Sequence, residues 1–157
     1  MEELTLKSTI QMTTMEELSE TEQALINNAI EATYHSYSPY SHFHVGAAVL
    51  LENGKTIIGC NQENISYPAG ICAERTAIFT AGVQYPDTPI DMLAIAARNA
   101  DGMLQEEPIN PCGICRQVMI ETETRFQKPI RILLYGTKYI YIINGIKMLM
   151  PLSFTKF

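Results

Sequence analysis

Three cysteines and one glutamate are the residues of this chain whose types and spacing could do chemistry. They lie in Cys72-Ala73-Glu74-Arg75 and in Pro111-Cys112-Gly113-Ile114-Cys115-Arg116-Gln117, so that Cys112 follows Cys72 by forty residues. Zinc binds thiolates in a tetrahedron, and a site with three protein ligands leaves its fourth position to water or substrate, as catalytic zinc sites do. The spacing therefore predicts one zinc ion per chain, bound by Cys72, Cys112 and Cys115.

Each half of this pattern is ambiguous when it stands alone. A single C-x-x-C also occurs in redox pairs and in structural zinc knuckles. Together the halves match the zinc nucleobase deaminase signature, in which a His or Cys, one residue and a Glu precede P-C-x-x-C. In that chemistry water activated by zinc attacks the ring carbon that carries the amine, C4 in cytosine, and the Glu shuttles protons. Glu74 is therefore the expected general acid and base.

Both cysteine segments are predicted at the N-termini of helices. The first helix is expected over about 72–81, with Gly82 as its C-cap. The second is expected to run to about residue 124, with Asn110 as N-cap and Pro111 at the first helical position. Helix N-termini favour negative charge and hence thiolates. Three thiolates exceed the charge of the metal, so hydrogen bonds from Arg75 and Arg116 to sulfur are expected to compensate.

The other segments predict an α/β layer fold. Residues 4–12 alternate between apolar and polar side chains, as a strand or an extended arm does. Ser19 and Glu22 form a capping box that begins a helix over about 20–35. Strands are expected at 43–51, 56–58, 92–97, 130–135 and 139–143, a loop at 61–70 and a short helix at 146–150. This order predicts parallel strands in the centre of a sheet. The expected division is an N-terminal arm, 1–18, and one domain, 19–157.

Composition narrows the class of partner. The chain has 157 residues, a formal net charge of −6 and a pI near 5.0, and it has no cluster of Lys and Arg. A polynucleotide is normally bound by a basic groove, so the charge favours a small, uncharged substrate over nucleic acid. The first residues are acidic, and no apolar run approaches the roughly 20 residues that span a bilayer. We therefore expect a cytoplasmic protein without membrane contact, whose thiols stay reduced.

Longer motifs carry a resemblance to a known family. These motifs are Tyr37-Ser38-Pro39-Tyr40-Ser41-x-Phe43-x-Val45-Gly46-Ala47-Ala48, Asn61-x-Glu63-Asn64-x-Ser66-Tyr67 and the two cysteine segments. Over about residues 20–154 the chain resembles the small, homotetrameric, zinc-dependent cytidine deaminases. The resemblance implies a three-layer α/β/α sandwich with a five-stranded mixed sheet, to which the N-terminal residues would add an arm or an extra strand. It also implies hydrolysis of cytidine and deoxycytidine to uridine and deoxyuridine plus ammonia.

The resemblance also assigns contacts to the substrate. Phe43 matches the phenylalanine that stacks on the pyrimidine ring, and Asn61 and Glu63 match the pair that holds the ribose 3′-hydroxyl. The backbone N–H of Ala73 would receive the pyrimidine carbonyl. The carbonyl of Asn110 would face the departing ammonia.

A homotetramer with active sites shared between subunits is a further implication. Phe154 resembles the aromatic residue that reaches into a neighbouring subunit's site. We expect Arg75, Arg116 and Gln117 to support the metal ligands without binding the metal themselves. Cys60 fits no ligand position and is expected to be a buried apolar filler.

Three other functions share part of this pattern. A deaminase for cytosine-containing antibiotics would share both cysteine segments but would lack Asn61-x-Glu63-Asn64. A non-catalytic module would use zinc only to join two helix ends, and it would need neither Glu74 nor an open ligand position. A nucleic-acid deaminase would share the metal site but would need a basic surface. Conversion of free cytidine to uridine separates an enzyme from a zinc module.

Overall fold

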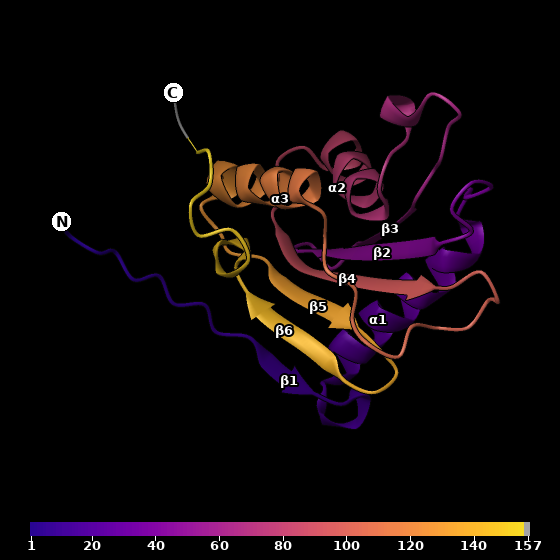
Figure 1. Ribbon diagram of the computed structural model, residues 1–157, viewed down its shortest axis with the longest axis horizontal. Coiled ribbons are helices and arrows are strands. Elements are labelled where there is room, and N and C mark those ends of the chain that lie inside the picture. Colours follow the sequence, from indigo (N-terminus) through magenta and orange to yellow (C-terminus); the bar gives the residue numbers. More distant parts are fainter. Residues whose placement is uncertain (156–157) are drawn as a thin grey trace.

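The computed structural model describes residues 1–155 and contains one mixed sheet with helices on both faces (Figure 1). Its strands are β1 (Gln11–Thr13), β2 (His44–Leu51), β3 (Thr56–Cys60), β4 (Ile90–Arg98), β5 (Arg131–Tyr135) and β6 (Ile140–Asn144). Its α-helices are α1 (Glu20–Ala32), α2 (Ala73–Gln84) and α3 (Gly113–Phe126), and its 3₁₀ turns are η1 (Met15–Glu17), η2 (Thr33–His35), η3 (Tyr67–Ala69) and η4 (Ile146–Met148). Within residues 1–155, none of these helices has the length and apolar character that crossing a bilayer requires. The predicted α/β class is confirmed.

The sheet has the strand order β1-β6-β5-β4-β2-β3. β4 and β5 run parallel at its centre, and the other neighbouring strands are antiparallel. Continuous apolar runs suit the central strands because both of their faces are covered. The five predicted strands are present. β1 adds a sixth by pairing with β6, from Gln11↔Ile142 to Thr13↔Ile140, which is the extra strand that the N-terminal pattern allowed.

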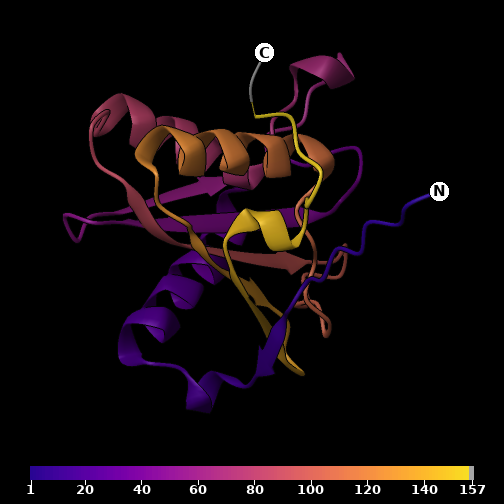
Figure 2. The same cartoon turned by 90° about the vertical axis from the view of Figure 1, so that its left-hand side faces the viewer.

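Three layers are visible in Figures 1 and 2, with α1 on one face of the sheet and α2 and α3 on the other. Each face has its own core. Leu25, Ile26 and Ala29 of α1 pack against small side chains of β2 and β4. On the opposite face α2 and α3 pack against the alternate side chains, such as Leu93 and Ile95 of β4. This alternation fixes the strand register, because a shift by one residue would exchange the two sets of side chains.

Two glycines let the helices approach the sheet closely. A Cβ on Gly59 of β3 would lie 2.6 Å from the Ala73 carbonyl oxygen of α2. A Cβ on Gly46 of β2 would lie 2.6 Å from the Thr33 backbone nitrogen, at the end of α1. Both distances are well inside van der Waals contact with backbone atoms, so only glycine fits at either position. Gly59 therefore sets how close the first turn of α2 lies to the sheet.

The C-terminal ends of two helices differ from the prediction. α1 ends at Ala32 and is followed by the 3₁₀ turn η2, where one helix was predicted to residue 35. α2 continues through Gly82, the predicted C-cap, to Gln84. Gly82 is not among the residues with positive φ, and the Tyr85 N–H still donates to the Ala81 carbonyl. A glycine inside a helix costs only about 1 kcal/mol, so the helix continues past it.

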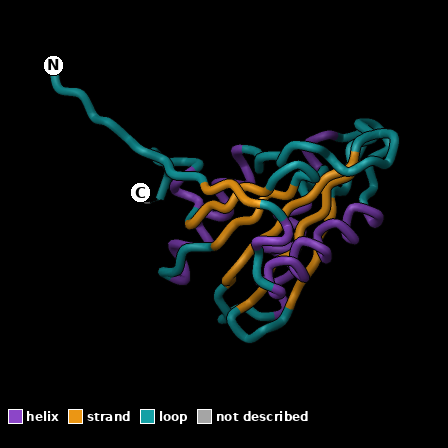
Figure 3. The backbone as a smooth tube through the Cα atoms, turned by 90° about the horizontal axis from the view of Figure 1, so that it is seen from below, coloured by secondary structure: helices purple, strands orange, loops and turns teal. Residues whose placement is uncertain are grey.

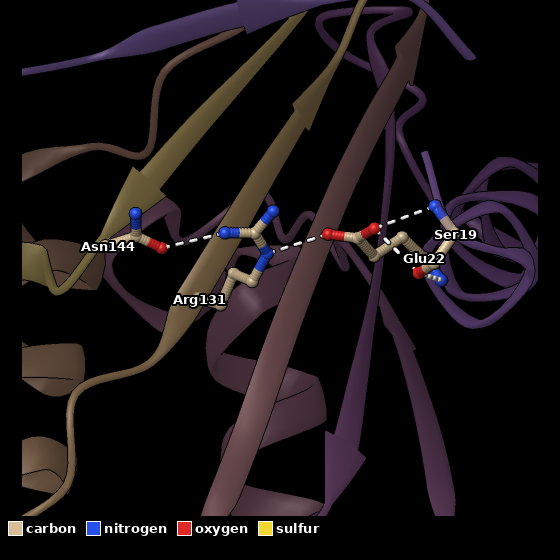
Figure 4. A network of polar contacts seen from close by, with 4 residues as sticks. All are labelled: Ser19, Glu22, Arg131 and Asn144. Carbon is tan, nitrogen blue, oxygen red and sulfur yellow. Dashed lines mark hydrogen bonds and ion pairs between the residues drawn. The ribbon is translucent and has the colours of Figure 1, made fainter. Parts of the chain in front are cut away.

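A polar network fixes α1 against the sheet (Figure 4). Glu22 accepts from the N–H and the hydroxyl of Ser19, the N-cap of α1, at 2.9 and 2.7 Å. The Glu22 N–H donates to Ser19 Oγ at 3.3 Å, which completes the predicted capping box. The other carboxylate oxygen of Glu22 accepts from Arg131 Nε of β5 at 2.7 Å, and Arg131 Nη1 donates to Asn144 Oδ1 of β6 at 3.0 Å. Burial raises the pKa of Glu22, but the hydrogen bonds from Ser19 and Arg131 outweigh it, and the pKa lies below its usual value.

The first ten residues lie outside the body of the protein. They have no regular secondary structure and extend away from β1, as Figures 1 and 3 show. Residues 4–12 were predicted to form a strand or an extended arm, and only the C-terminal end of this range joins the sheet, in β1. The division into an arm, 1–18, and a domain, 19–157, stays a prediction, and residues 156 and 157 lie outside the described part of the chain.

Candidate metal centre and active site

The N-terminal ends of α2 and α3 bring the three predicted ligands together. Cys72 is the N-cap of α2, Cys112 is the N-cap of α3, and Cys115 lies in the first turn of α3. The prediction of Asn110 as N-cap and Pro111 as first helical residue is wrong. The Cys112 sulfur takes the capping position instead, because it accepts from the Cys115 N–H at 3.5 Å. A predicted metal ligand is therefore also the residue at which α3 begins.

The separations of the sulfur atoms fit a zinc ion. Cys72 Sγ lies 3.9 Å from Cys112 Sγ, and Cys112 Sγ lies 3.4 Å from Cys115 Sγ. All three lie within 4.8 Å of one another, and among residues 1–155 no other group of His, Cys, Asp or Glu converges in this way. Zinc–sulfur bonds of about 2.3 Å at tetrahedral angles place sulfurs about 3.8 Å apart. A redox pair needs two thiols, whereas here the Cys72 sulfur converges on the sulfurs of Cys112 and Cys115, so the geometry favours a metal site.

The pKa values of the Cys72 and Cys115 thiols are shifted in opposite directions. A hydrogen bond from Cys115, assisted by Arg75, lowers the pKa of the Cys72 thiol to about 5. Arg75 Nη2 lies 3.7 Å from Cys72 Sγ, so the predicted hydrogen bond from this arginine to a ligand sulfur is present. The hydrogen bond to Cys72, together with burial, raises the pKa of the Cys115 thiol. Of the two, Cys72 is therefore the thiol that ionises first, and the guanidinium of Arg75 balances its charge.

Glu74 lies in the first turn of α2, two residues beyond Cys72, and its side chain is only 5 % exposed. Burial raises the pKa of its carboxyl, and the charge of Cys72 raises it further. A carboxyl with a raised pKa exchanges protons near neutral pH more readily than an ordinary glutamate does. The first turn of α2 thus places a proton-transfer group beside the sulfur cluster.

A cavity of about 640 Å³ lies against the sulfur cluster. Cys72, Cys112, Glu74 and Arg75 form part of its wall. The predicted substrate contacts that line it are Phe43, Asn61, Glu63, Ala73 and Asn110. These residues come from the start of β2, the loop after β3, the start of α2 and the loop before α3, so the fold brings four distant segments together. The volume lies in the range of pockets that bind small molecules, roughly 300–1,000 Å³.

Both polar atoms of the Asn61 side-chain amide form hydrogen bonds within the chain. Its Oδ1 accepts from Ser36 Oγ at 2.6 Å and from the Val45 N–H at 2.8 Å, and its Nδ2 donates to the Phe43 carbonyl at 2.9 Å. Asn61 therefore fixes the backbone on both sides of His44, at the start of β2. The orientation of Phe43 at the cavity depends on this anchor.

Glu63 is held by the loop that precedes β2. Its carboxylate accepts from the Tyr40 N–H at 2.9 Å and from the Ser41 N–H at 3.2 Å, and it also accepts from the Ser41 hydroxyl. The bond from the Ser41 hydroxyl and the two backbone bonds lower the pKa of Glu63. Glu63 therefore stays charged at the cavity wall.

Arg116, Gln117 and Phe154 do not line the cavity. Arg116 donates from Nε to the Pro111 carbonyl and from Nη1 to the Leu149 carbonyl, each at 2.8 Å. These bonds take the place of the predicted bond to a thiolate and tie the loop before α3 to the C-terminal segment. Gln117 Nε2 donates to the Phe154 carbonyl at 2.7 Å, and the Phe154 side chain is 62 % exposed.

One feature of this region has no counterpart among the predictions, and the prediction for Cys60 is wrong. Tyr40 and Tyr67 line the cavity with their ring centroids 6.0 Å apart in an edge-to-face arrangement. Both stand in the motifs that carry the resemblance, so a signal was present, but neither received a role. Cys60 is only half-buried, and its sulfur donates to the His35 carbonyl at 3.2 Å, so it is not the buried filler that was expected.

Comparison with known proteins identifies the family. The family model of the cytidine and deoxycytidylate deaminase zinc-binding region matches residues 19–128, which include all three cysteines and Glu74. The chain belongs to this deaminase family. Its relatives include the cytidine deaminase of Halalkalibacterium halodurans, 50% identical over 99 residues that cover 63% of this chain and 70% of that protein. The cytidine deaminase of Mycobacterium tuberculosis is 37% identical over 114 residues, covering 68% and 77%.

Solved structures of deaminases share the fold. The crystal structure of cytidine deaminase from Burkholderia pseudomallei superposes on the chain with a TM-score of 0.71 at 35% identity. The superposition covers 87% of this chain and 100% of that one. The deaminase of Mycobacterium tuberculosis gives a TM-score of 0.68 at 29% identity over 88% of this chain and 100% of that chain. The three-layer arrangement around the cysteine cluster is thus a deaminase architecture.

Proposed function

We propose that the protein is a zinc-dependent cytidine deaminase that hydrolyses cytidine and deoxycytidine to uridine and deoxyuridine plus ammonia. The observation that carries the proposal is the cluster of Cys72, Cys112 and Cys115 beside the buried Glu74, at the wall of a small-molecule cavity. Family membership and the name of the relative that is 50% identical support the same activity. Three protein ligands leave one tetrahedral position for water, which a purely structural site does not need.

The residues around the cluster have separable tasks. Zinc held by the three sulfurs would supply Lewis acidity toward water. Glu74, whose carboxyl has a raised pKa, accepts a proton from the attacking water, delivers one to the N3 atom of the ring and assists the departure of ammonia. Ala73 begins α2, and its backbone N–H, which has no partner within the helix, holds the pyrimidine carbonyl. The carbonyl of Asn110 faces the leaving amine.

A nucleoside suits the cavity better than a nucleotide. Phe43 offers an aromatic face to the ring. Among the described residues that line the cavity, Arg75 is the only Lys or Arg, and it is engaged with Cys72. A phosphate at the sugar end would therefore meet the charge of Glu63 without a cation to receive it. The 3′-hydroxyl is expected to share the carboxylate that now accepts from the Ser41 hydroxyl.

The assembly that we propose is a homotetramer whose active sites are completed across subunits. The Phe154 side chain is exposed and lies outside the cavity lining of its own chain. Arg116 and Gln117 hold the backbone of the C-terminal segment against α3. An aromatic ring supplied by a neighbouring subunit would cover the substrate and exclude water. We also propose a cytoplasmic location, where thiols stay reduced for metal.

The substrate assignment is tested by kcat/KM values for cytidine, deoxycytidine, free cytosine and cytidine monophosphate. Both nucleosides should react at similar rates, because both carry the 3′-hydroxyl. Free cytosine lacks the sugar and therefore gains no contact with Asn61 and Glu63, so its kcat/KM should lie below that of either nucleoside. The monophosphate should be poorer than cytidine.

A variant that lacks the Glu63 charge tests whether electrostatic repulsion, and not poor steric fit, makes cytidine monophosphate the poorer substrate. Glu63→Gln removes the negative charge at the sugar end, so it should lower kcat/KM for cytidine while narrowing the gap between cytidine and its monophosphate. Glu121→Gln removes an exposed charge on α3 and should change neither value. Equal kcat/KM for cytidine and cytidine monophosphate in the wild-type protein would contradict the nucleoside assignment.

A further inference from the structure

Residues 1–13, called the N-terminal segment or simply the arm in this subsection, comprise the first ten residues and β1, and they carry an apolar face that the described part of the chain leaves uncovered. Its members alternate with polar residues and are Leu4, Leu6, Ile10 and Met12, with exposed fractions of 78, 46, 43 and 66 %. Successive side chains of a β-strand point to opposite sides, so all four share one side when the arm pairs as a strand. The arm extends away from the body (Figures 1 and 3). The proposed deamination uses none of these residues.

The arm also continues an open edge of the sheet. β1 is the last strand at that edge and pairs with β6. Its other side presents backbone N–H and C=O groups to which a further strand can pair. Met12 lies opposite Tyr141 of β6, and Tyr141 packs against the core between the sheet and α3. The apolar side of the arm therefore continues the sheet face that is covered by α3.

The sequence of the arm is self-complementary about Ser8. When two copies pair antiparallel with Ser8 opposite Ser8, Leu4 of each copy lies opposite Met12 of the other, and Leu6 lies opposite Ile10. Cross-strand apolar pairs of this kind are the unit of sheet stabilisation. A two-fold axis repeats each contact, as isologous interfaces require. All four apolar side chains of each arm then have an apolar partner.

Other antiparallel registers leave apolar side chains of the arm without apolar partners. A pair centred on Lys7 places the two lysines directly opposite each other, which is unfavourable, and leaves Leu6 and Met12 without apolar partners. A pair centred on Thr9 leaves Leu4 and Ile10 without them. A pair centred between two residues sets the apolar side of one arm beside the polar side of the other. The register centred on Ser8 has neither opposed lysines nor an apolar side chain without an apolar partner.

We propose that residues 3–13 pair with the same residues of a second copy of this chain, in an antiparallel ribbon whose two-fold axis passes through Ser8. Residues 11–13 of each copy then lie between β6 of their own sheet and residues 3–5 of the other copy. The sheets of two molecules become continuous, and the open edge of β1 is closed. This contact is independent of the tetramer contact proposed for Phe154 and of the catalytic proposal.

Cysteine substitution in the full chain tests the register. Ser8→Cys places two thiols opposite each other at the two-fold axis, within the roughly 7 Å between Cα atoms that a disulfide needs. With oxidised glutathione, the non-reducing gel should show a covalent dimer joined through residue 8. Thr5→Cys is the matched control, because residue 5 faces residue 11, and two copies of residue 5 lie about 20 Å apart. The wild-type chain, with its four cysteines, gives the background.

Second substitutions in the Ser8→Cys chain test the apolar side. Leu6→Lys places a charge opposite Ile10 twice per ribbon and should slow disulfide formation on the order of tenfold or more. Thr5→Lys adds the same charge on the polar side and should leave the rate within about twofold of the parent. Mass spectrometry of non-reduced peptides locates the bond. Absence of a residue 8 dimer, equal dimerisation of Thr5→Cys, or an unchanged rate in Leu6→Lys would overturn the proposal.

Discussion

Substitution of Gly59 by alanine should damage the active site through the backbone of α2. The new Cβ would lie 2.6 Å from the Ala73 carbonyl oxygen and would also crowd the Ala77 nitrogen, whereas ordinary contact begins at 3.4 Å. Both neighbours are backbone atoms of a helix that cannot rotate aside. The first turn of α2 must therefore move away from β3 by about 1 Å. This turn follows Cys72 and carries Glu74, so both residues are displaced with it.

The size of the effect follows from this displacement. Overpacking of a well-packed interior typically costs about 1–3 kcal/mol, so Gly59→Ala should lower the free energy of unfolding by that amount. A misplacement of about 1 Å can cost about 10²-fold in rate. We expect kcat/KM for cytidine to fall by about 10²-fold and zinc to be held more weakly. Urea unfolding, metal analysis of the purified protein and steady-state kinetics measure the three effects.

Gly82→Ala is the matched control, because Gly82 lies in the same helix and a Cβ there would meet nothing within 4 Å. Alanine is the better helix former by up to about 1 kcal/mol, so this variant should be slightly more stable and fully active. Wild-type kcat/KM and zinc content in Gly59→Ala would refute the reasoning. Equal damage from Gly82→Ala would refute it as well.

Other substitutions separate the metal, the proton shuttle and the fold. Cys112→Ala should release zinc, measured as less than one ion per chain after dialysis, and full occupancy would show that the ligand set is wrong. Glu74→Gln should retain zinc and lower kcat by about 10²- to 10⁴-fold, and a rate near wild type would require another base. Glu22→Gln should lower the free energy of unfolding at pH 7 by about 1–3 kcal/mol, because it weakens the bonds to Ser19 and Arg131. The lowered pKa of Glu22 means that its stabilisation is present above the unfolded pKa of about 4.3 and is lost as pH falls through the folded pKa. Urea unfolding at a series of pH values should therefore show a steeper acid loss in wild type than in Glu22→Gln, and parallel curves would contradict this.

Local chemistry made the start of α1 and the metal ligands predictable. The capping box of Ser19 and Glu22 is a contact between residues three apart, and the structure contains it. The two cysteine segments each carry a recognisable half of one coordination set, so their convergence could be inferred without the fold. Ligand chemistry restricts which residues must meet, and the α/β architecture then provides two helix ends to carry them.

Long-range partners could not be predicted in the same way. Glu22 also binds Arg131, which lies 109 residues away, and no local pattern marks that pair. Arg116 was expected at a sulfur, but the carbonyls of Pro111 and Leu149 compete for its donors, and that competition depends on where the C-terminal segment folds. Asn61 was predicted to bind the ribose. Its hydrogen bond to the Phe43 carbonyl is a tertiary contact, and no local sequence pattern marks it.

The most direct test of the account is the rate of uridine formation from cytidine by purified protein, measured as a function of zinc bound per chain. We predict that chelated protein is inactive and that the rate rises in proportion to zinc up to one ion per chain. If the zinc bound by Cys72, Cys112 and Cys115 is catalytic, the rate must be proportional to the zinc content. Turnover by zinc-free protein, or protein with one zinc per chain that leaves cytidine unchanged, would contradict the central claim.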